Sequence, residues 1–281
     1  MASDTKCLFA TDLHGQASRY DKLLAAIQDL SPAAVFLGGD LLPHALHGDL
    51  EQSEVIHCFC KLRQSMGNAY PKVFIILGND DPRSFETCLF EYEQQGLWCH
   101  AHNRRAVLGT NPVYGYACVP PTPFRLKDWE RYDVSRYCDP GCISPEEGIH
   151  TVAVEENEIK WGTIGKDLDG LAGEESLERA VFLFHCPPYD TPLDHADLEG
   201  TRFEHAPVDP HVGSIAIRRF IENRQPLLTL HGHVHESTRL TGTWKTRIGR
   251  TTCINASHDG PELAVVQFDL EAPSEAVRFL I

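Results

Sequence analysis

The sequence predicts an α/β fold, and two observations carry this prediction. Apolar, β-prone runs alternate with segments of helical spacing in the first third of the chain, which is typical of strands and helices that build a parallel sheet. Five apolar runs also lead into polar side chains of the kind that bind metals. A strand that ends in such a side chain places it at the carboxyl edge of the sheet, where α/β proteins build their sites.

The apolar runs are predicted as strands. The five that precede polar residues are 7–10, 34–37, 73–77, 180–184 and 227–230. Two short strands are expected within 105–117 and one at 150–154. After residue 235 the pattern changes to short strands, which we predict at 237–240, 244–248, 252–255, 263–270 and 277–281.

Helices are predicted between the first strands. Segment 18–30 has apolar residues at helical spacing, with Ser18 as its N-cap and Pro32 just beyond its end. Segments 50–66 and 82–95 are the second and third, the latter with a proline at its start. The segment 119–175 is less regular and rich in Pro, Gly and charge. Because no linker is evident, we expect one domain over 1–281 with an irregular insertion at about 119–175.

Composition excludes several classes of protein. An apolar share of 42% in 281 residues is enough for a core, so the chain is not disordered. A net charge of −15 argues against nonspecific binding to nucleic acids or anionic membranes. No run of 18 apolar residues predicts a membrane span, and the first residues do not resemble a signal peptide, so we expect a cytoplasmic protein.

The ten cysteines are expected to be reduced thiols. Several lie inside apolar runs, where a thiol packs as a small hydrophobe. Cys138 and Cys142 flank a Pro-Gly pair, and a plain turn is favoured there over a second metal site or a redox pair. The chain has no glycine-rich phosphate loop, no nucleophile elbow and no H-E-x-x-H motif, which removes the nucleotide-binding ATPase, serine hydrolase and zincin classes.

Five short polar segments carry the candidate chemistry. They are Asp12-Leu13-His14, Gly39-Asp40, Gly78-Asn79-Asp80-Asp81, His185 and Gly232-His233-Val234-His235. Separately, the glycine-containing pairs are typical of turns, and a lone histidine is more often a core residue than a ligand. Together they offer carboxylate, amide and imidazole groups, which divalent cations take. Seven ligands are too many for one tetrahedral zinc and suit two metals that share a carboxylate.

At these residues the chain resembles the calcineurin-like metallophosphoesterases, whose pattern is D-x-H, G-D, G-N-H-[D/E], H and G-H-x-H. It is similar in particular to a bacterial and archaeal branch of small predicted phosphoesterases. That branch carries an H-x-P-P-Y stretch, a G-S segment before the last helix and an N-P-G-S-like strand end, found here at 185–189, 213–214 and 255–257. The resemblance implies a two-sheet β-sandwich flanked by helices on both outer faces, a four-layer αββα fold.

The resemblance also implies two metal sets and a reaction. One set comprises Asp12, His14, Asp40 and His235. The other comprises Asp40, Asn79, His185 and His233, with Asp40 bridging. The implied cofactors are two divalent ions, with Mn, Fe and Zn as candidates. The implied reaction is phosphoester hydrolysis by in-line attack of a metal-bridging hydroxide, in which Asp40, Asn79, Asp80 and His185 are the expected catalytic residues.

The third segment departs from the family pattern. Asp80 stands where the family has the histidine that protonates the leaving group. Nearby metals should outweigh repulsion from Asp81, so we expect Asp80 to be ionised. The preferred substrates are then phosphodiesters or esters with a good leaving group. The alternative is a non-catalytic or very slow protein on the same fold that binds a nucleotide or phosphate or serves as a scaffold.

Substrate contacts are expected around the insertion and the H-x-P-P-Y stretch. Basic and aromatic residues alternate from Arg125 onward and could hold a phosphate and a ring, although an ordinary amphipathic helix at 126–137 is favoured there. The expected substrate contacts are Asn79, Arg125 and Tyr189, with weaker candidates at His195, His205 and His211. The expected partner is a small phosphorylated molecule, with a nucleotide as one candidate. The sequence does not indicate an oligomeric state.

Overall fold

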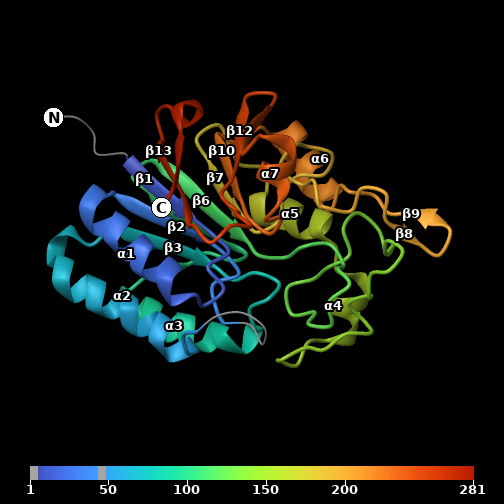
Figure 1. The fold of residues 1–281 in the computed structure, drawn as a ribbon, viewed down its shortest axis with the longest axis horizontal. Coiled ribbons are helices and arrows are strands. Elements are labelled where there is room, and N and C mark those ends of the chain that lie inside the picture. Colours follow the sequence, from blue (N-terminus) through green and yellow to red (C-terminus); the bar gives the residue numbers. More distant parts are fainter. Residues whose placement is uncertain (1–5, 44–48) are drawn as a thin grey trace.

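Two six-stranded sheets pack face to face in the computed structural model, which describes residues 6–43 and 49–281 (Figure 1). The first has the strand order β14-β13-β1-β2-β3-β4 and the second β11-β12-β10-β7-β6-β5. The strands of the first sheet are β1 Lys6–Ala10, β2 Ala34–Gly38, β3 Lys72–Ile76, β4 Cys99–His100, β13 Ala264–Asp269 and β14 Val277–Leu280. Those of the second are β5 Arg104–Leu108, β6 Asn111–Tyr116, β7 Val181–Phe184, β10 Leu228–His231, β11 Lys245–Ile248 and β12 Thr251–Asn255.

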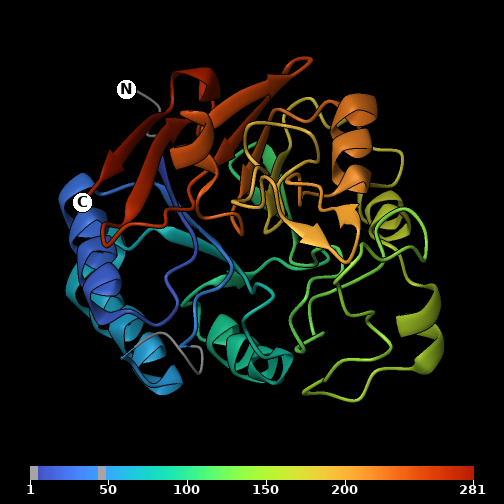
Figure 2. The same ribbon diagram turned by 45° about the vertical axis from the view of Figure 1, so that its right-hand side comes forward.

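Helices cover the outer faces of both sheets (Figure 2). The first sheet carries α1 Ala17–Leu30, α2 Gln52–Met66 and α3 Glu86–Gln94. The second carries α5 Ile164–Ala172 and α6 Ile215–Arg224, which pack against each other. Shorter elements are α4 Glu156–Trp161, α7 Ser237–Thr241, the hairpin β8 Arg202–Phe203 and β9 Ala206–Pro207, and the 3-10 turns Gly67–Ala69, Arg83–Phe85 and Pro273–Glu275. The predicted helix–sheet–sheet–helix sandwich is therefore confirmed.

The central strands β1, β2, β3, β7 and β10 form where apolar runs predicted them. Neighbouring central strands run parallel, β1 with β2 and β3 in one sheet, and β7 with β10 in the other. Nearly all their residues are buried, because helices or the other sheet cover both faces, and this explains the continuous apolar runs. Parallel pairing also sends the carboxyl ends of these five strands to one edge of the sandwich.

Three local predictions are wrong. The segment 237–240 is the short helix α7 rather than a strand, and its last residue, Thr241, donates its hydroxyl to the carbonyl of Ser237 at 2.7 Å. The strand at 150–154 is absent, because Thr151 donates its amide to Asp128 Oδ1 at 2.8 Å instead of pairing with a neighbouring strand. Ser18 lies inside α1, whose N-cap is Gln16.

The amphipathic helix predicted at 126–137 is also absent, and the chain there consists of bends, a turn and isolated β-bridges. Its backbone bonds to distant segments, with the amide of Arg131 donating to the carbonyl of Val119 at 3.0 Å and the amide of Lys127 to that of Ile149 at 2.8 Å. The ammonium of Lys127 is fully buried against Glu130, an arrangement that an exposed basic helix face does not provide. The segment lies between α3 and α4.

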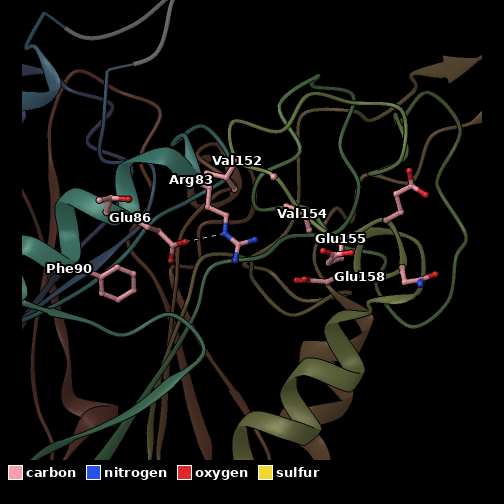
Figure 3. Close-up of a pocket in the computed structure, with 11 residues that line it drawn as sticks. Arg83, Glu86, Phe90, Val152, Val154, Glu155 and Glu158 are labelled. Carbon is pink, nitrogen blue, oxygen red and sulfur yellow. Dashed lines mark hydrogen bonds and ion pairs between the residues drawn. The ribbon is translucent and has the colours of Figure 1, made fainter.

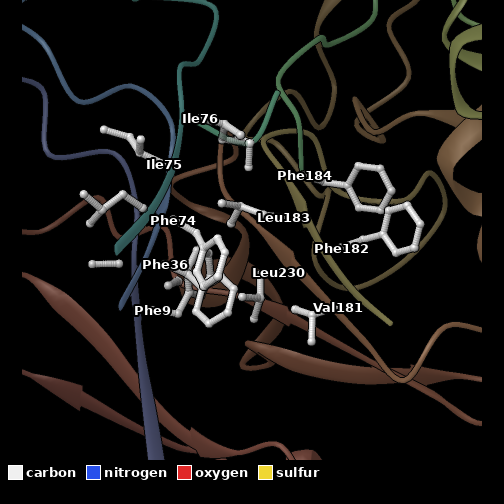
Figure 4. Close-up of a cluster of buried hydrophobic side chains, with 14 of the residues drawn as sticks. Phe9, Phe36, Phe74, Ile75, Ile76, Val181, Phe182, Leu183, Phe184 and Leu230 are labelled. Atoms are coloured by element: carbon white, nitrogen blue, oxygen red, sulfur yellow. The ribbon is translucent and has the colours of Figure 1, made fainter. Parts of the chain in front are cut away.

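Aromatic side chains pack both between the two sheets and between the second sheet and its helices (Figure 4). Phe9, Phe36 and Phe74 are register partners on β1, β2 and β3, and the rings of Phe36 and Phe74 stack with centroids 5.1 Å apart. On β7, Phe182 and Phe184 point to the opposite side of the sheet from Leu183 and pack against a ring of α6. Alternation along the strand therefore separates the sheet–sheet core from the sheet–helix core.

No disulfide joins the ten cysteines, all of which lie within residues 6–43 and 49–281. Cys142 donates its amide to the carbonyl of Asp139 at 3.0 Å, which makes the segment around Pro140 a turn. Over the same residues, no helix is long and apolar enough to cross a membrane.

One buried histidine predicts a pH-dependent stability. His100 on β4 is 1% exposed, both of its ring nitrogens lack a hydrogen-bond partner, and burial lowers its pKa from 6.5 to about 4. At acidic pH the unfolded state binds a proton at His100 that the folded state does not bind. The contribution of His100 to the unfolding free energy is therefore complete above pH 6.5 and is lost as the pH falls towards 4. When the pH falls from 7.5 to 5, we expect the wild type to lose about 2 kcal/mol more unfolding free energy than His100→Phe loses.

Denaturant unfolding at the two pH values measures this difference. The matched control is His57→Phe, because His57 is exposed on α2. An equal acid-induced loss in the wild type and His100→Phe would show that other groups account for the acid sensitivity.

Candidate metal centre

The polar segments singled out in the sequence meet at the carboxyl edge of both sheets. Asp12 and His14 follow β1, Asp40 follows β2 and Asn79 follows β3. From the second sheet, His185 follows β7, and His233 and His235 follow β10. Each sheet thus contributes side chains to one cluster, and parallel pairing explains why residues up to 223 positions apart in the chain lie together.

The backbone at this edge is held in unusual conformations. Asp12, His14, Asp40 and His233 have φ values of 56°, 48°, 50° and 72°, in the left-handed region that non-glycine residues rarely adopt. Hydrogen bonds join the loops after β1 and β2, with the amide of Asp12 donating to the carbonyl of Gly39 at 3.0 Å and that of His14 to the carbonyl of Asp40 at 2.8 Å. The amide of His233 donates to Asp12 Oδ1 at 3.2 Å. Strain of this kind gathers at functional sites, where it orients side chains.

Two glycines allow the segments to approach closely. A Cβ atom on Gly78 would lie 2.3 Å from Asp40 Oδ1, and one on Gly232 would lie 2.4 Å from Thr11 Oγ1. Neither contact is tolerated, so glycine is required beside the carboxylates of the cluster. The glycines that looked like turn residues in the sequence have the additional role of making room for these carboxylates.

The side chains form two groups that share one carboxylate. In the first, offered ligand atoms of Asp12, His14, Asp40 and His235 lie within 4.8 Å of one another. In the second, those of Asp40, His185 and His233 do so. The amide oxygen Oδ1 of Asn79 adjoins the second group, 3.0 Å from His185 Nε2. Asp40 belongs to both groups.

Nitrogen and oxygen atoms face one another within the groups. His14 Nε2 lies 3.2 Å from His235 Nε2, which in turn lies 3.3 Å from Asp12 Oδ1. His185 Nε2 lies 3.2 Å from Asp40 Oδ2. The buried Nδ1 of His14 has no hydrogen-bond partner. Converging carboxylate and imidazole donors, with one buried nitrogen left unpartnered, fit divalent cations of the Mn, Fe or Zn type.

The carboxylates and imidazoles of the cluster shift one another's pKa values. Burial opposes ionisation of Asp40 and Asp12, but the neighbouring histidines outweigh burial and hold the pKa of Asp40 at about 2 and that of Asp12 well below its usual range. Burial likewise opposes protonation of His185, but Asp40 raises its pKa to about 10. Burial lowers the pKa of His233 to about 3, and the charge of His185 adds to this effect. Both carboxylates are therefore ionised at neutral pH.

Polar neighbours orient the cluster. His185 donates Nδ1–H to the carbonyl of Gly38 at 2.8 Å, which leaves Nε2 facing Asp40 and Asn79. The hydroxyl of Ser257 donates to Asp12 Oδ2 at 2.6 Å. Sequence reasoning noted Ser257 only as part of a family-like strand end and did not connect it with Asp12.

The two aspartates of the third segment have different surroundings. Asp81 is fully buried, and its carboxylate accepts from the amides of Leu41, Leu42 and Gly78 at 2.8–3.1 Å. It ties the loops after β2 and β3 together. Asp80 lies beside the first group, with Oδ2 3.7 Å from His14 Nδ1, and accepts from the side-chain amide of Asn79 at 3.1 Å.

The expected substrate contacts other than Asn79 lie outside the two groups. Tyr189 is half-buried and donates its hydroxyl to Asp209 Oδ2 at 2.7 Å, and Arg125 is exposed on the irregular segment. His211 contacts Asp194, with Nδ1 2.9 Å from Oδ1, and pairs through its backbone with His195. His205 lies at the exposed turn of the β8–β9 hairpin.

Comparisons with known proteins agree with this architecture. A family model described as calcineurin-like phosphoesterase matches residues 5–237. An uncharacterized protein of Methanocaldococcus jannaschii, MJ1162, is 34% identical over 85 residues, which are 30% of this chain and 33% of that relative. The chain thus spans about a third of the length of this relative.

Solved structures of similar fold include three of comparable length. TT1561 of Thermus thermophilus has a TM-score of 0.58 at 16% identity, with 99% of both chains covered. The phosphopantetheinyl hydrolase PptH of Mycobacterium tuberculosis has a TM-score of 0.54 at 11% identity, with 93% of this chain and 92% of that chain covered. A dimetal phosphatase of Danio rerio has 0.51 at 10% identity, with 99% of both covered. At these identities the likeness establishes the fold, whereas the family model covers most of the chain and both groups of the cluster up to His235. The chain belongs to the calcineurin-like phosphoesterase family.

Proposed function

We propose that the chain hydrolyses phosphodiesters, or phosphoesters with a good leaving group, with two divalent cations bound at the carboxyl edge of the sheets. The observation that carries this proposal is the position of Asp40, whose carboxylate belongs to both groups of candidate ligands. Asp12, His14, Asp40 and His235 would hold one cation. Asp40, Asn79, His185 and His233 would hold the other.

The chain's residues orient the reaction. When bound, the two cations polarise the phosphoryl oxygens and supply a water of lowered pKa as nucleophile. Asp40 fixes the two groups relative to each other, and the bond from His185 Nδ1 to the carbonyl of Gly38 keeps Nε2 aimed at Asp40. Asn79 lies between His185 and Asp80 and is suited to orient a phosphoryl oxygen.

The preference for good leaving groups follows from Asp80. A carboxylate beside the first group has no proton to give, so an alkoxide would leave without acid help. The absence of a general acid typically costs about 10²–10⁴-fold on such substrates. We infer that the natural substrate is a small phosphorylated molecule, with a nucleotide as one candidate, held in part by Tyr189 and Arg125.

Metal removal and return test the proposal. We expect protein treated with chelator to lose turnover of bis-p-nitrophenyl phosphate and to regain it with Mn²⁺, Fe²⁺ or Zn²⁺. At a metal concentration 100 times the dissociation constant, binding should raise the unfolding free energy by about 2.7 kcal/mol per site. His235→Ala should need more metal than the wild type both to regain turnover and to be stabilised. The control His57→Phe should need no more metal than the wild type. Metal-dependent stabilisation without turnover would instead favour a binding protein on the same fold.

A further inference from the structure

A small cavity lies behind Arg83, between the turn that precedes α3 and the irregular segment. Its volume is about 270 Å³, and it is lined by Arg83, His102, Trp129, Asp128, Glu130 and His150, among others. A wider cavity of about 720 Å³ adjoins it and shares Arg83, so the guanidinium lies where the two meet (Figure 3). No residue of the metal centre lines either cavity.

Three N–H groups on the walls of the small cavity have no partner. Trp129 is 1% exposed, and its indole N–H is unpartnered. His102 accepts from the amide of Ala117 at Nδ1, at 2.9 Å, so its proton is on Nε2, for which the described residues offer no acceptor. Arg83 uses Nε to bond Glu86 at 3.0 Å, and its two terminal nitrogens have no hydrogen bond within the described part of the chain.

The acidic side chains of this cavity do not satisfy these donors. Asp128 accepts from the amides of Arg83 and Thr151 and from the hydroxyl of Thr151. Glu130 accepts from the amide and hydroxyl of Thr122 and from Lys127. Glu158, the third carboxylate of the wall, accepts from Arg131, so each carboxylate is bonded to other groups. Leaving the buried indole N–H of Trp129 unpaired costs about 1–3 kcal/mol, so a ligand that accepts from it is favoured.

The rings bring the donors together. The guanidinium carbon of Arg83 lies 5.5 Å from the centroid of the Trp129 ring, and the rings of His102 and Trp129 meet edge to face with centroids 4.8 Å apart. Burial lowers the pKa of His102 well below its usual value, so this ring donates as a neutral imidazole. Two further cations of the wall, Lys127 and Arg131, are paired with Glu130 and Glu158. The terminal nitrogens of Arg83 and the N–H groups of Trp129 and His102 therefore face a space of small-molecule size, an arrangement that suits an oxyanion.

One acceptor on the wall narrows the identity of the oxyanion. His150 donates from Nε2 to the carbonyl of Pro145 at 3.0 Å, and its Nδ1, 4.0 Å from Asp128 Oδ1, has no hydrogen bond and can accept one when the ring is neutral. A ligand that complements the whole wall has several acceptor oxygens and one O–H donor. Inorganic phosphate keeps one such proton at neutral pH, sulfate has none, and a phosphate ester loses its last acidic proton near pH 6.

We propose that this cavity binds inorganic hydrogen phosphate, with Arg83, His102 and Trp129 donating to its oxygens and its O–H donating to His150 Nδ1. The site is separate from the metal centre and does not depend on the proposed hydrolytic function. Arg83 follows Asp80 by only three residues, so occupancy of the cavity bears on the loop that carries Asn79 and Asp80.

The indole N–H signal of Trp129 reports on the cavity directly. The full-length protein, labelled with ¹⁵N at its four tryptophans and loaded with zinc, is titrated with inorganic phosphate at pH 7.5. Trp129→Phe assigns the signal. We expect a saturable shift of this signal, with sulfate binding about 10-fold more weakly because it lacks the O–H that pairs with His150.

Two variants make the test selective. Arg83→Gln should weaken phosphate binding at Trp129 by about 10-fold or more, because a charge-assisted bond is lost. The matched control Arg179→Gln removes an equally positive, half-exposed side chain that pairs with Glu271 and lines neither cavity, so it should leave the titration unchanged. His150→Phe should equalise phosphate and sulfate. The proposal is overturned if the Trp129 signal does not move, or if Arg83→Gln titrates as the wild type does.

Discussion

Replacing Asp40 by Asn should abolish most of the phosphoesterase activity. Asp40 is 2% exposed, holds a pKa of about 2 and belongs to both groups of candidate ligands. The amide keeps the size of the side chain but removes the charge that two cations would share. Changing a residue that only supports a metal ligand typically costs about 10–100-fold, so we expect turnover of bis-p-nitrophenyl phosphate to fall by at least about 10³-fold.

Metal content distinguishes this effect from a loss of fold. We expect Asp40→Asn to bind fewer divalent ions per chain, as measured by elemental analysis, than His235→Ala, which removes a ligand of one group only. Asp197→Asn is the matched control, because its carboxylate is 64% exposed and pairs with Arg239 outside the cluster. Wild-type turnover and metal content in Asp40→Asn would show that the two groups do not share this carboxylate.

The central sheets could be predicted from the sequence because their signals are local. Apolar runs such as 34–37 and 73–77 are buried on both faces, and each is followed within three residues by a polar residue of the cluster. The arrangement of β1, β2 and β3 then brings Asp12, Asp40 and Asn79 together without further information. The assignment of Tyr189 and Arg125 to substrate binding stays a prediction: Tyr189 donates to Asp209, and Arg125 is exposed on the irregular segment.

The irregular segment could not be predicted because distant contacts shape it. Lys127 and Glu130 pair in the interior, and Asp128 accepts from the amides of Arg83 and Thr151, which are 45 and 23 positions away in sequence. Helical spacing of basic and aromatic residues was therefore misleading at 126–137. The single-domain boundary with an insertion at 119–175 also stays a prediction. The roles of Ser257 and Asp81 depended likewise on contacts between loops, which residue types alone do not reveal.

The structure changes the expected role of Asp81 in the third segment. From the sequence, Asp81 was expected to act on its neighbour by repelling the charge of Asp80. Its carboxylate instead accepts from three backbone amides, of Leu41, Leu42 and Gly78. Asp81 is thus committed to joining two loops. A new imidazole at position 80 would have to be held by the cluster itself.

Replacing Asp80 by His should restore acid help to poor leaving groups. The side chain of residue 80 lies beside His14 and Asn79, at the edge of the first group, where a leaving group would depart. In the wild type we expect turnover to fall steeply as the pKa of the leaving group rises from p-nitrophenol towards simple alcohols. Asp80→His should gain up to about 10²-fold on alkyl esters and little on p-nitrophenyl esters, with the largest gain below about pH 7, where an imidazolium is present.

Asp80→Asn separates proton donation from loss of charge. The amide has the size of aspartate and no acidic proton, so it should change turnover on all leaving groups by a similar factor. If Asp80→Asn and Asp80→His change turnover alike across all leaving groups, the wild-type carboxylate lowers turnover by repelling anionic substrates. The lack of a proton donor at position 80 would then not be the cause. If the wild type shows a flat dependence on leaving-group pKa and Asp80→His gains nothing, another residue supplies the proton. His195 and His211 are then the first to replace, because their backbones pair beside the H-x-P-P-Y stretch that begins at His185.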